Sequence, residues 1–401
     1  MNVSDIRKDF PTIREGNSVY LDSACQTLRP YQVIDAITSY YKEFPACGGR
    51  SVHSMATKVS MAVDRSREKV ASFFGCKDPH NFIFTKNCTE GMNIVAKGFG
   101  LRKGDSVLTT DMEHNSNHVQ WVEMAEDIGI KRKIVRTSKN GEFDIENFKK
   151  EMTKDVKLVS MVHTSNVTGS SIPVKEITEI AHDMGAAVLI DGAQAAPHMP
   201  VNLKTLDVDF YAVSVHKMLG PSGMGILYGK EERLKKLRPL ISGGGTVGLA
   251  TYDSVKLTVH PEKFEAGLMD YAGVIGTSAA LDYLSKIGMK NVEKHIASLQ
   301  KRIDDELRNV MSITTVGPAD PSKRSGIFSF NIKGMGSHDI AMMLDNADNI
   351  MIRSGMHCAH PFFVSRGLEG CARASLYIYN NEDDILRFTA AVKKLASTFS
   401  K

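Results

Sequence analysis

The sequence lacks the features that mark several classes of protein. No apolar run approaches the ~20 residues that a membrane-spanning helix needs, and the polar N-terminus has no signal-peptide core. The six cysteines have neither the density of a disulfide framework nor paired zinc spacings, so we expect no metal site. The net charge of +4, from 50 basic and 46 acidic residues, gives no case for nucleic acid as a partner. We therefore expect a cytoplasmic protein that binds neither a membrane nor a nucleic acid.

The chain also has no internal repeat, low-complexity tract or Pro-rich linker, although 401 residues suggest two or three domains. From about residue 80 to 230, short apolar runs alternate with amphipathic segments. This alternation predicts an α/β fold with a mainly parallel sheet covered on both faces, and binding sites beyond the carboxyl ends of its strands. The expected strands are 107–108, 133–135, 156–162, 188–190 and 210–213, and the expected helices are 145–152 and 174–184.

The pattern changes after residue 260, where long helical segments dominate. We expect a large domain over 15–258 and a smaller α+β domain made of 1–14 and 259–401. The triple glycine at 243–245 is expected to form a flexible loop near the boundary. The predicted elements of this second part are helices 271–287, 291–310, 338–344 and 382–399 and a half-buried strand at 326–332.

Two polar residues come directly after strand-like apolar runs. Asp191 follows the run 186–190, and Lys217 comes shortly after the run 208–213. This is the pair that an enzyme using pyridoxal phosphate needs, because a lysine holds the cofactor as a Schiff base and a carboxylate keeps its ring nitrogen protonated. The alternatives are a solvated lysine and an aspartate that caps the next helix. Gln194, Ser214 and His216, which lie close to the pair in sequence, favour the cofactor interpretation.

Two further segments have an ordinary and a functional interpretation. Residues 85–91 precede a helical pattern, and the backbone N–H groups at a helix start bind phosphate well. The same segment could instead form a simple N-cap through Asn87 or Thr89. His114 follows an expected strand, where an imidazole could stack on a cofactor ring or be merely structural.

Cys358 lies among glycine, histidine and proline residues, which indicate a loop over 353–361. Nearby cationic groups would favour its nucleophilic thiolate, although cysteine is usually a small buried hydrophobe. A metal site of His357, Cys358 and His360 would not have a standard zinc spacing. Arg373 precedes a strand-like run, where its guanidinium could hold a substrate carboxylate or form a surface salt bridge.

Together these segments resemble the cysteine desulfurases of the second group (the SufS type) within the class V aminotransferase family. Residues 113–117 (Glu-His-Asn-Ser-Asn) resemble the family's Glu-His-His-Ala-Asn, and 353–361 resembles its Arg-Thr-Gly-His-His-Cys-Ala-x-Pro. The segments 165–169, 264–267 and 373–375 match its Ser-Asn-Val-x-Gly, its Phe-Glu-Ala-Gly and its arginine strand. The resemblance runs from about Tyr20 to the C-terminus. It implies the fold type I architecture of pyridoxal 5'-phosphate enzymes and a homodimer with active sites at the subunit interface.

The resemblance also implies a role for each site residue. Lys217 would hold the cofactor and shuttle protons, His114 would stack on its ring, and Cys358 would accept the sulfur. The implied cofactor-binding residues are Lys217, Asp191, Gln194, His114, Asn166, Cys88, Thr89, Ser214 and His216. The implied substrate-binding residues are Arg373, Asn166, Ala24, His53 and Arg353.

The implied reaction converts L-cysteine to L-alanine and leaves the sulfur as a persulfide on Cys358. This is covalent catalysis with a thiolate as acceptor. A persulfide is useful only if something collects it, so a sulfur-acceptor protein or an iron–sulfur scaffold is the expected partner. Iron–sulfur cluster assembly and other sulfur-containing products are the expected destinations.

Several positions depart from the family. Residues 22–26 differ from its Asp-Asn-Ala-Ala-Thr, Met356 replaces a histidine, and Leu268 replaces a threonine that reaches the partner subunit's phosphate. Unusual cysteines also fall near the expected site. They are either unrelated buried thiols or a cluster that relays sulfur or binds an iron–sulfur centre. These cysteines are Cys25, Cys47, Cys88 and Cys371.

Two other functions stay open on the sequence. One is a different reaction on the same fold, such as selenocysteine lysis or another class V aminotransferase or lyase reaction. The other is a non-catalytic scaffold that carries the cofactor and a cysteine cluster. A nucleotide site is not expected, because the glycines at 98–104 have the wrong spacing for the dinucleotide fingerprint and no Walker A motif occurs.

Overall fold

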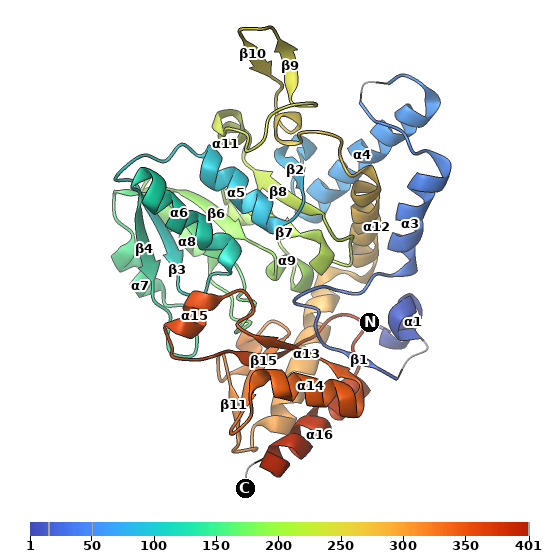
Figure 1. The fold of residues 1–401 in the computed structure, drawn as a ribbon, viewed down its shortest axis with the longest axis vertical. Helices are drawn as coiled ribbons and strands as arrows, with labels where there is room; N and C mark the ends of the chain where they lie inside the picture. The colour runs from blue at the N-terminus through green and yellow to red at the C-terminus, as the bar shows by residue number, and fades with distance from the viewer. Residues whose placement is uncertain (15–16, 50, 400–401) are drawn as a thin grey trace.

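The structure is a computed structural model that describes residues 1–14, 17–49 and 51–399. Within this part of the chain, the largest sheet has seven strands in the order β2-β8-β7-β6-β5-β3-β4 (Figure 1). β8 runs antiparallel to β2 and β7, and the other neighbours are parallel. The sheet is therefore mainly parallel, as predicted. Its strands are β2 (Phe82–Thr85), β3 (Ser106–Thr110), β4 (Lys131–Val135), β5 (Val156–Val162), β6 (Ala187–Asp191), β7 (Phe210–Ser214) and β8 (Gly225–Gly229).

Both faces of this sheet are buried under helices. Along β6, Val188 belongs to one apolar cluster and Leu189 to a second, because successive side chains point to opposite faces. β5 divides in the same way, with Leu158 and Val159 in different clusters. Strands buried on both sides read as continuous apolar runs, which is why they were recognisable in the sequence. The helices around the sheet include α5 (Cys88–Gly98), α6 (Val119–Ile128), α7 (Ile145–Glu151) and α8 (Val174–Asp183).

The C-terminal part forms a separate antiparallel sheet in the order β11-β12-β15-β14. Figure 1 shows it below the large sheet, covered by helices of the same region. The fold class is thus confirmed: a large, mainly parallel sheet is joined to a smaller α+β region. The elements of that region are α13 (Met289–Leu307), β11 (Ile313–Thr315), β12 (Ile327–Ile332), α14 (Ser337–Asp348), β14 (Arg353–Gly355), β15 (Cys371–Ser375) and α16 (Glu382–Phe399).

The N-terminal segment is tied to the C-terminal region. Arg7 of α1 (Val3–Lys8) lies 2.9 Å from the Asp384 carboxylate and also donates to the carbonyl of Tyr379. β1 (Val19–Tyr20) pairs in parallel with β13 (Ile350–Met351). These contacts support a domain that includes both ends of the chain. The boundaries at 258 and 259 stay a prediction, and the one at residue 15 lies outside the described residues.

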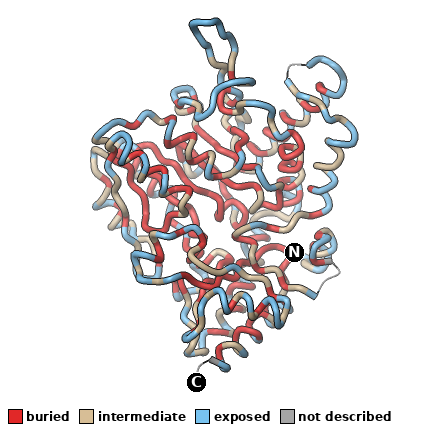
Figure 2. Tube along the Cα trace, in the orientation of Figure 1, coloured by how far each residue is buried: buried red, intermediate tan, exposed pale blue. Residues whose placement is uncertain are grey.

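The long helix α12 (Tyr271–Ile287) joins the two regions. It packs against α3 (Tyr31–Glu43) and α4 (Ser54–Phe73), and α13 follows it directly. A hairpin of β9 (Val247–Ala250) and β10 (Val255–Leu257) projects beyond the large sheet, just after the triple glycine (Figure 1). Figure 2 shows this hairpin as mostly exposed, in contrast to the buried strands below it. Among the described helices, none is both long and apolar enough to cross a membrane.

Candidate active site

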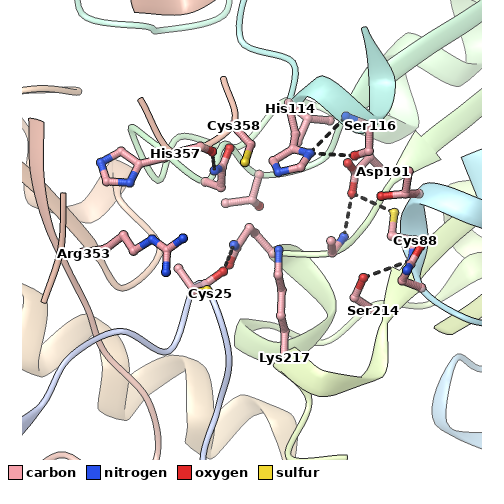
Figure 3. A pocket seen from close by; sticks show the side chains of 18 of the residues that line it. Cys25, Cys88, His114, Ser116, Asp191, Ser214, Lys217, Arg353, His357 and Cys358 are labelled. Atoms are coloured by element: carbon pink, nitrogen blue, oxygen red, sulfur yellow. Dashed lines mark hydrogen bonds between the residues drawn. The ribbon is translucent and has the colours of Figure 1, made fainter. Parts of the chain in front are cut away.

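A cavity of about 360 Å³ opens at the carboxyl ends of the central strands, where the C-terminal sheet meets the large one (Figure 3). It brings together residues from widely separated parts of the sequence. All but one of the predicted site residues line it. Those residues are Ala24, Cys88, Thr89, His114, Asn166, Asp191, Gln194, Ser214, His216, Lys217, Arg353, Cys358 and Arg373.

Asp191 ends β6 and is held from two sides. Its Oδ1 accepts the backbone N–H of Ala193 at 3.0 Å and lies 3.3 Å from the Cys88 Sγ. A Cβ at Gly192 would overlap the ring of Tyr211, so this position requires the close approach that only glycine allows. The carboxylate is therefore fixed at the floor of the cavity rather than used as a helix cap.

Lys217 ends the short helix η3 (Val215–Lys217), which follows β7 directly. The turn is anchored by Thr27, whose hydroxyl donates to the His216 carbonyl and accepts the N–H of Leu219. Burial lowers the pKa of the Lys217 amine, while the nearby Asp191 charge acts in the opposite direction. A lowered pKa increases the share of neutral amine, which is the form that attacks a carbonyl carbon or accepts a proton.

The start of α5 supplies the elements of an anion site. Asn87 caps the helix by accepting the N–H of Glu90 at 3.0 Å, so the predicted N-cap is present. The Ser214 hydroxyl reaches this helix start and accepts the N–H of Cys88 at 3.0 Å. Thr89 is exposed there. His216 is half-buried, and burial is the main reason that its pKa is lowered to about 4. A helix N-terminus flanked by hydroxyls and an imidazole is suited to a phosphate group.

His114 is held as a neutral imidazole. Its Nδ1 accepts the backbone N–H of Ser116 at 3.1 Å, which leaves the proton on Nε2. The Ser116 hydroxyl lies 2.7 Å from the same nitrogen. Burial, followed by the Lys217 charge, lowers the pKa of His114 to about 4. Figure 3 places its ring above the cavity, between Cys358 and Asp191.

Cys358 lies on a tight turn with unusual backbone angles. His357 and Cys358 have φ values of 49° and 55°, which is the left-handed region that non-glycine residues rarely adopt. Two neighbouring segments hold the turn: Asn115 donates its N–H to the Cys358 carbonyl at 2.6 Å, and Asn166 donates its side-chain amide to the His357 carbonyl at 2.8 Å. The Cys358 side chain is exposed at the cavity. Strain that its surroundings maintain in this way is typical of functional sites.

The prediction of a loop over 353–361 was wrong at both ends. Residues Arg353–Gly355 form β14, which pairs with β15, and His360–Val364 forms the short helix α15. Only the turn around Cys358 is irregular. The strand was missed because its pairing with β15 is a contact between distant parts of the chain.

Arg373 lies in the middle of β15 and is buried, so it is not the surface residue of the alternative interpretation. Its guanidinium donates to the Asn166 carbonyl at 2.9 Å and to Asp22 Oδ1 at 3.3 Å. Asp22 also lies 3.8 Å from Arg353, which is half exposed. Burial raises the pKa of the Asp22 carboxyl, although the charges of the two arginines act in the opposite direction. Asp22 was not among the predicted site residues, although it stands in the segment 22–26 that departs from the family pattern.

The residues present fit pyridoxal phosphate. Within the described residues, the buried atoms Asn166 Oδ1 and Gln194 Oε1 have no hydrogen-bond partner. Both lie on the cavity, where the polar substituents of a ring could satisfy them. An amine, a carboxylate and a helix N-terminus on the same cavity match the aldehyde, ring nitrogen and phosphate of the cofactor.

Three predictions concern residues that the structure places away from the cavity. His53 caps the start of α4 and is exposed, so this chain alone does not bring it to the site. Cys47 is exposed and does not line the cavity. Cys371 is buried beneath His357, and the His357 Nε2 lies 3.3 Å from the Cys371 sulfur. Leu268 is 72% exposed and does not line the cavity.

Of the unusual cysteines, Cys25 and Cys88 line the cavity together with Cys358. In the described part of the chain, no three or more His, Cys, Asp or Glu side chains are grouped so that they could hold a metal ion. The iron–sulfur interpretation of the cysteines therefore has no support in this structure.

Comparison with known proteins identifies the family. A profile described as "Aminotransferase class-V" matches residues 19–388. The chain belongs to the class-V aminotransferase family. Its relatives within that family include a probable cysteine desulfurase of Halalkalibacterium halodurans, 39% identical over 100% of this chain and 99% of the relative. A protein named cysteine desulfurase in Haloferax volcanii is 37% identical over 100% of this chain and 98% of the relative.

Solved structures give the same assignment. A cysteine desulfurase from Thermococcus onnurineus superposes with a TM-score of 0.94 at 36% identity, covering 98% of each chain. A cysteine desulfurase from Escherichia coli superposes with a TM-score of 0.92 at 31% identity, covering 100% of this chain and 99% of the other. The similarity to this group of class-V proteins extends over the whole chain, including the elements that build the cavity.

Proposed function

We propose that this chain is a pyridoxal-phosphate-dependent cysteine desulfurase, which converts L-cysteine to L-alanine and transfers the sulfur to Cys358. The observation that carries the proposal is the strained turn that presents Cys358 to the cavity containing Lys217 and Asp191. A transaminase has no need of a thiol at this place. The similarity to cysteine desulfurases over the full length of the chain supports the same conclusion.

The residues that line the cavity would hold the cofactor as follows. Lys217 would hold its aldehyde carbon, Asp191 its ring nitrogen, and the start of α5 with Ser214 and His216 its phosphate. The neutral ring of His114 would cover one face. When bound, pyridoxal phosphate supplies an electron sink that stabilises negative charge on the substrate Cα.

The chain's own residues then carry the remaining steps. Arg373 would bind the substrate carboxylate through its planar fork of N–H donors. The Lys217 amine would take the Cα proton, and its lowered pKa favours the neutral form that this requires. The Cys358 thiolate attacks the substrate sulfur, so that an S–S bond forms and the Cβ–S bond breaks. The electron pair of the broken bond passes to Cβ, which takes up a proton, and Lys217 returns the proton to Cα, so that L-alanine leaves while the sulfur stays as a persulfide.

Four finer points belong to the same proposal. The chain acts as a SufS-type enzyme, works as a homodimer, supplies sulfur for iron–sulfur clusters or other products, and passes its persulfide to an acceptor protein. The exposed position of Cys358 supports the last point, because a partner's thiol must reach the persulfide. His53 keeps its predicted substrate role only if a second subunit brings it to a cavity.

The direct test compares Cys358→Ala with the parent. The cofactor-loaded proteins are incubated with L-cysteine, with and without a reductant, and alanine and sulfide are measured. We expect Cys358→Ala to lower alanine release by about 100-fold or more, because the attacking thiolate is gone. Cys47→Ala is the matched control, since Cys47 is exposed but lies away from the cavity, and it should keep parental activity.

Equal alanine release by Cys358→Ala and the parent would contradict the persulfide mechanism and favour a lyase. No alanine from the parent, despite bound cofactor, would mean that the substrate is not cysteine or that the chain is a non-catalytic scaffold.

A further inference from the structure

The cavity contains a thiol that the proposed mechanism does not use. Cys88 is the first residue of α5 and is 3% exposed. Its Sγ lies 3.3 Å from Asp191 Oδ1 and 3.4 Å from the carbonyl of Ala212, and its backbone N–H donates to Ser214 (Figure 3). One residue thus connects the proposed phosphate-binding helix to the carboxylate that would hold the ring nitrogen.

The thiol is suited to donate a hydrogen bond rather than to react. Burial, followed by the charge of Asp191, raises the pKa of the Cys88 thiol well above its ordinary value, so it keeps its proton. A protonated, buried thiol is a poor nucleophile, which argues against Cys88 as a station in a sulfur relay. Its S–H is a weak donor directed at a carboxylate and a carbonyl.

The arrangement around Asp191 is asymmetric. Oδ1 receives two donors, the Cys88 S–H and the Ala193 N–H. Among the described residues, none donates to Oδ2. Hydrogen bonds to a carboxylate favour its charged form, and two donors on one oxygen also set the orientation of the group. The free oxygen is then available for a cationic partner.

We propose that Cys88 is a positioning residue, whose S–H holds Asp191 so that its Oδ2 faces the ring nitrogen of the cofactor. This inference rests on the proposed cofactor but does not depend on desulfuration. Without the S–H donor, only the Ala193 N–H holds the Asp191 carboxylate, which can then turn away from the ring nitrogen, so that the ring nitrogen keeps its proton less well. The ring would then be a weaker electron sink.

The test uses pyridoxal phosphate labelled with ¹⁵N in the ring, bound to the parent, to Cys88→Ala and to Cys88→Ser. The ¹⁵N chemical shift reports whether the ring nitrogen carries a proton. We expect the signal of Cys88→Ala to move toward the unprotonated position and that of Cys88→Ser to stay at the parental one, because serine restores a donor. Cys76→Ala, which removes a partly buried thiol elsewhere, should leave the signal unchanged.

Cofactor affinity gives a second measurement. Titration of the cofactor-free proteins should show binding about tenfold weaker for Cys88→Ala, and close to parental for Cys88→Ser. A parental ¹⁵N signal in Cys88→Ala would overturn the inference, even if the affinity falls, because lost packing alone changes affinity without moving the proton. A parent that binds no pyridoxal phosphate would overturn the proposed function as well. A Cys88-dependent signal in a protein that makes no alanine would overturn desulfuration alone.

Discussion

At the scale of single residues, the environment of Glu113, which precedes His114, removes the negative charge that a glutamate usually carries at pH 7. Glu113 is buried and hydrogen-bonded at 2.6 Å to both the Thr110 hydroxyl and the Asn117 amide. Burial raises its pKa to about 8, so it is neutral at pH 7. Asn117 in turn accepts the indole N–H of Trp121, which links the acid to the core behind the site.

This environment predicts how stability depends on pH. Between about pH 4.5 and 8 the folded state holds a proton on Glu113 that the unfolded state has lost, so stability falls as the pH rises. The slope from one such group is about 1.4 kcal/mol per pH unit. Glu113→Gln removes the titrating group, so we expect urea unfolding between pH 7 and 8 to show a flatter pH dependence than the parent. The same slope in both proteins would contradict a neutral Glu113.

The window from pH 7 to 8 is chosen to avoid the buried histidines. Burial lowers the pKa of His163 and His198 to about 4 each. These residues are neutral in both states above pH 7, and they destabilise the fold only as the pH falls from about 6.5 toward 4. Glu113 therefore contributes separately above pH 7.

At the scale of elements, a buried ion pair joins α4 to the segment that follows the projecting hairpin. Arg67 and Glu265 form two hydrogen bonds, at 2.7 and 2.9 Å, and their side chains are 9% and 4% exposed. Glu265 also accepts the backbone N–H of Phe84 in β2. One carboxylate thus holds α4, β2 and the segment before α12 together.

Removal of one partner should be costly. Glu265→Ala leaves the buried guanidinium of Arg67 without its counter-charge, and we expect a loss of about 3–5 kcal/mol in the free energy of unfolding. Asp282→Ala is the matched control. Asp282 of α12 pairs with the exposed Lys69, which lies on α4 as Arg67 does, and exposed ion pairs contribute about 0–1 kcal/mol. Urea denaturation measures both. Comparable losses would mean that the Arg67–Glu265 pair contributes no more than a surface pair.

At the scale of the whole molecule, the β9–β10 hairpin stands apart from the rest of the chain. Leu249, Tyr252 and Val255 are exposed on it, although a chain that acts alone would be expected to keep such side chains covered. The homodimer that we propose would bury apolar surface of this kind.

We therefore expect the protein to sediment at twice its mass of 44.1 kDa. A variant with Leu249→Asp and Val255→Asp should shift toward the monomer, because burying two carboxylates in an interface is unfavourable. Met311→Asp, at an exposed site elsewhere, is the control and should remain dimeric. A monomeric parent in sedimentation would contradict the proposed homodimer.

Long elements with a clear period could be predicted from the sequence. The strand 156–162 and the helices 271–287 and 382–399 have the bounds that were expected. The helix expected at 291–310 begins and ends earlier, as Met289–Leu307. The three-residue strand β14 was missed, because so short a segment has no period of its own and exists only through its pairing with β15.

The sequence by itself determined the pair of residues that points to a pyridoxal phosphate site. Asp191 ends one buried strand and Lys217 lies three residues beyond the end of the next, and the order of apolar runs places both at one edge of a parallel sheet. The tertiary structure decided which other groups reach that edge. It brought in Cys358 through a turn held by Asn115 and Asn166, left His53 outside, and placed the Cys88 thiol against Asp191. The physical reason is that apolar runs and their spacing depend only on residues that are neighbours in the sequence, whereas these contacts depend on strand order and on packing between distant segments.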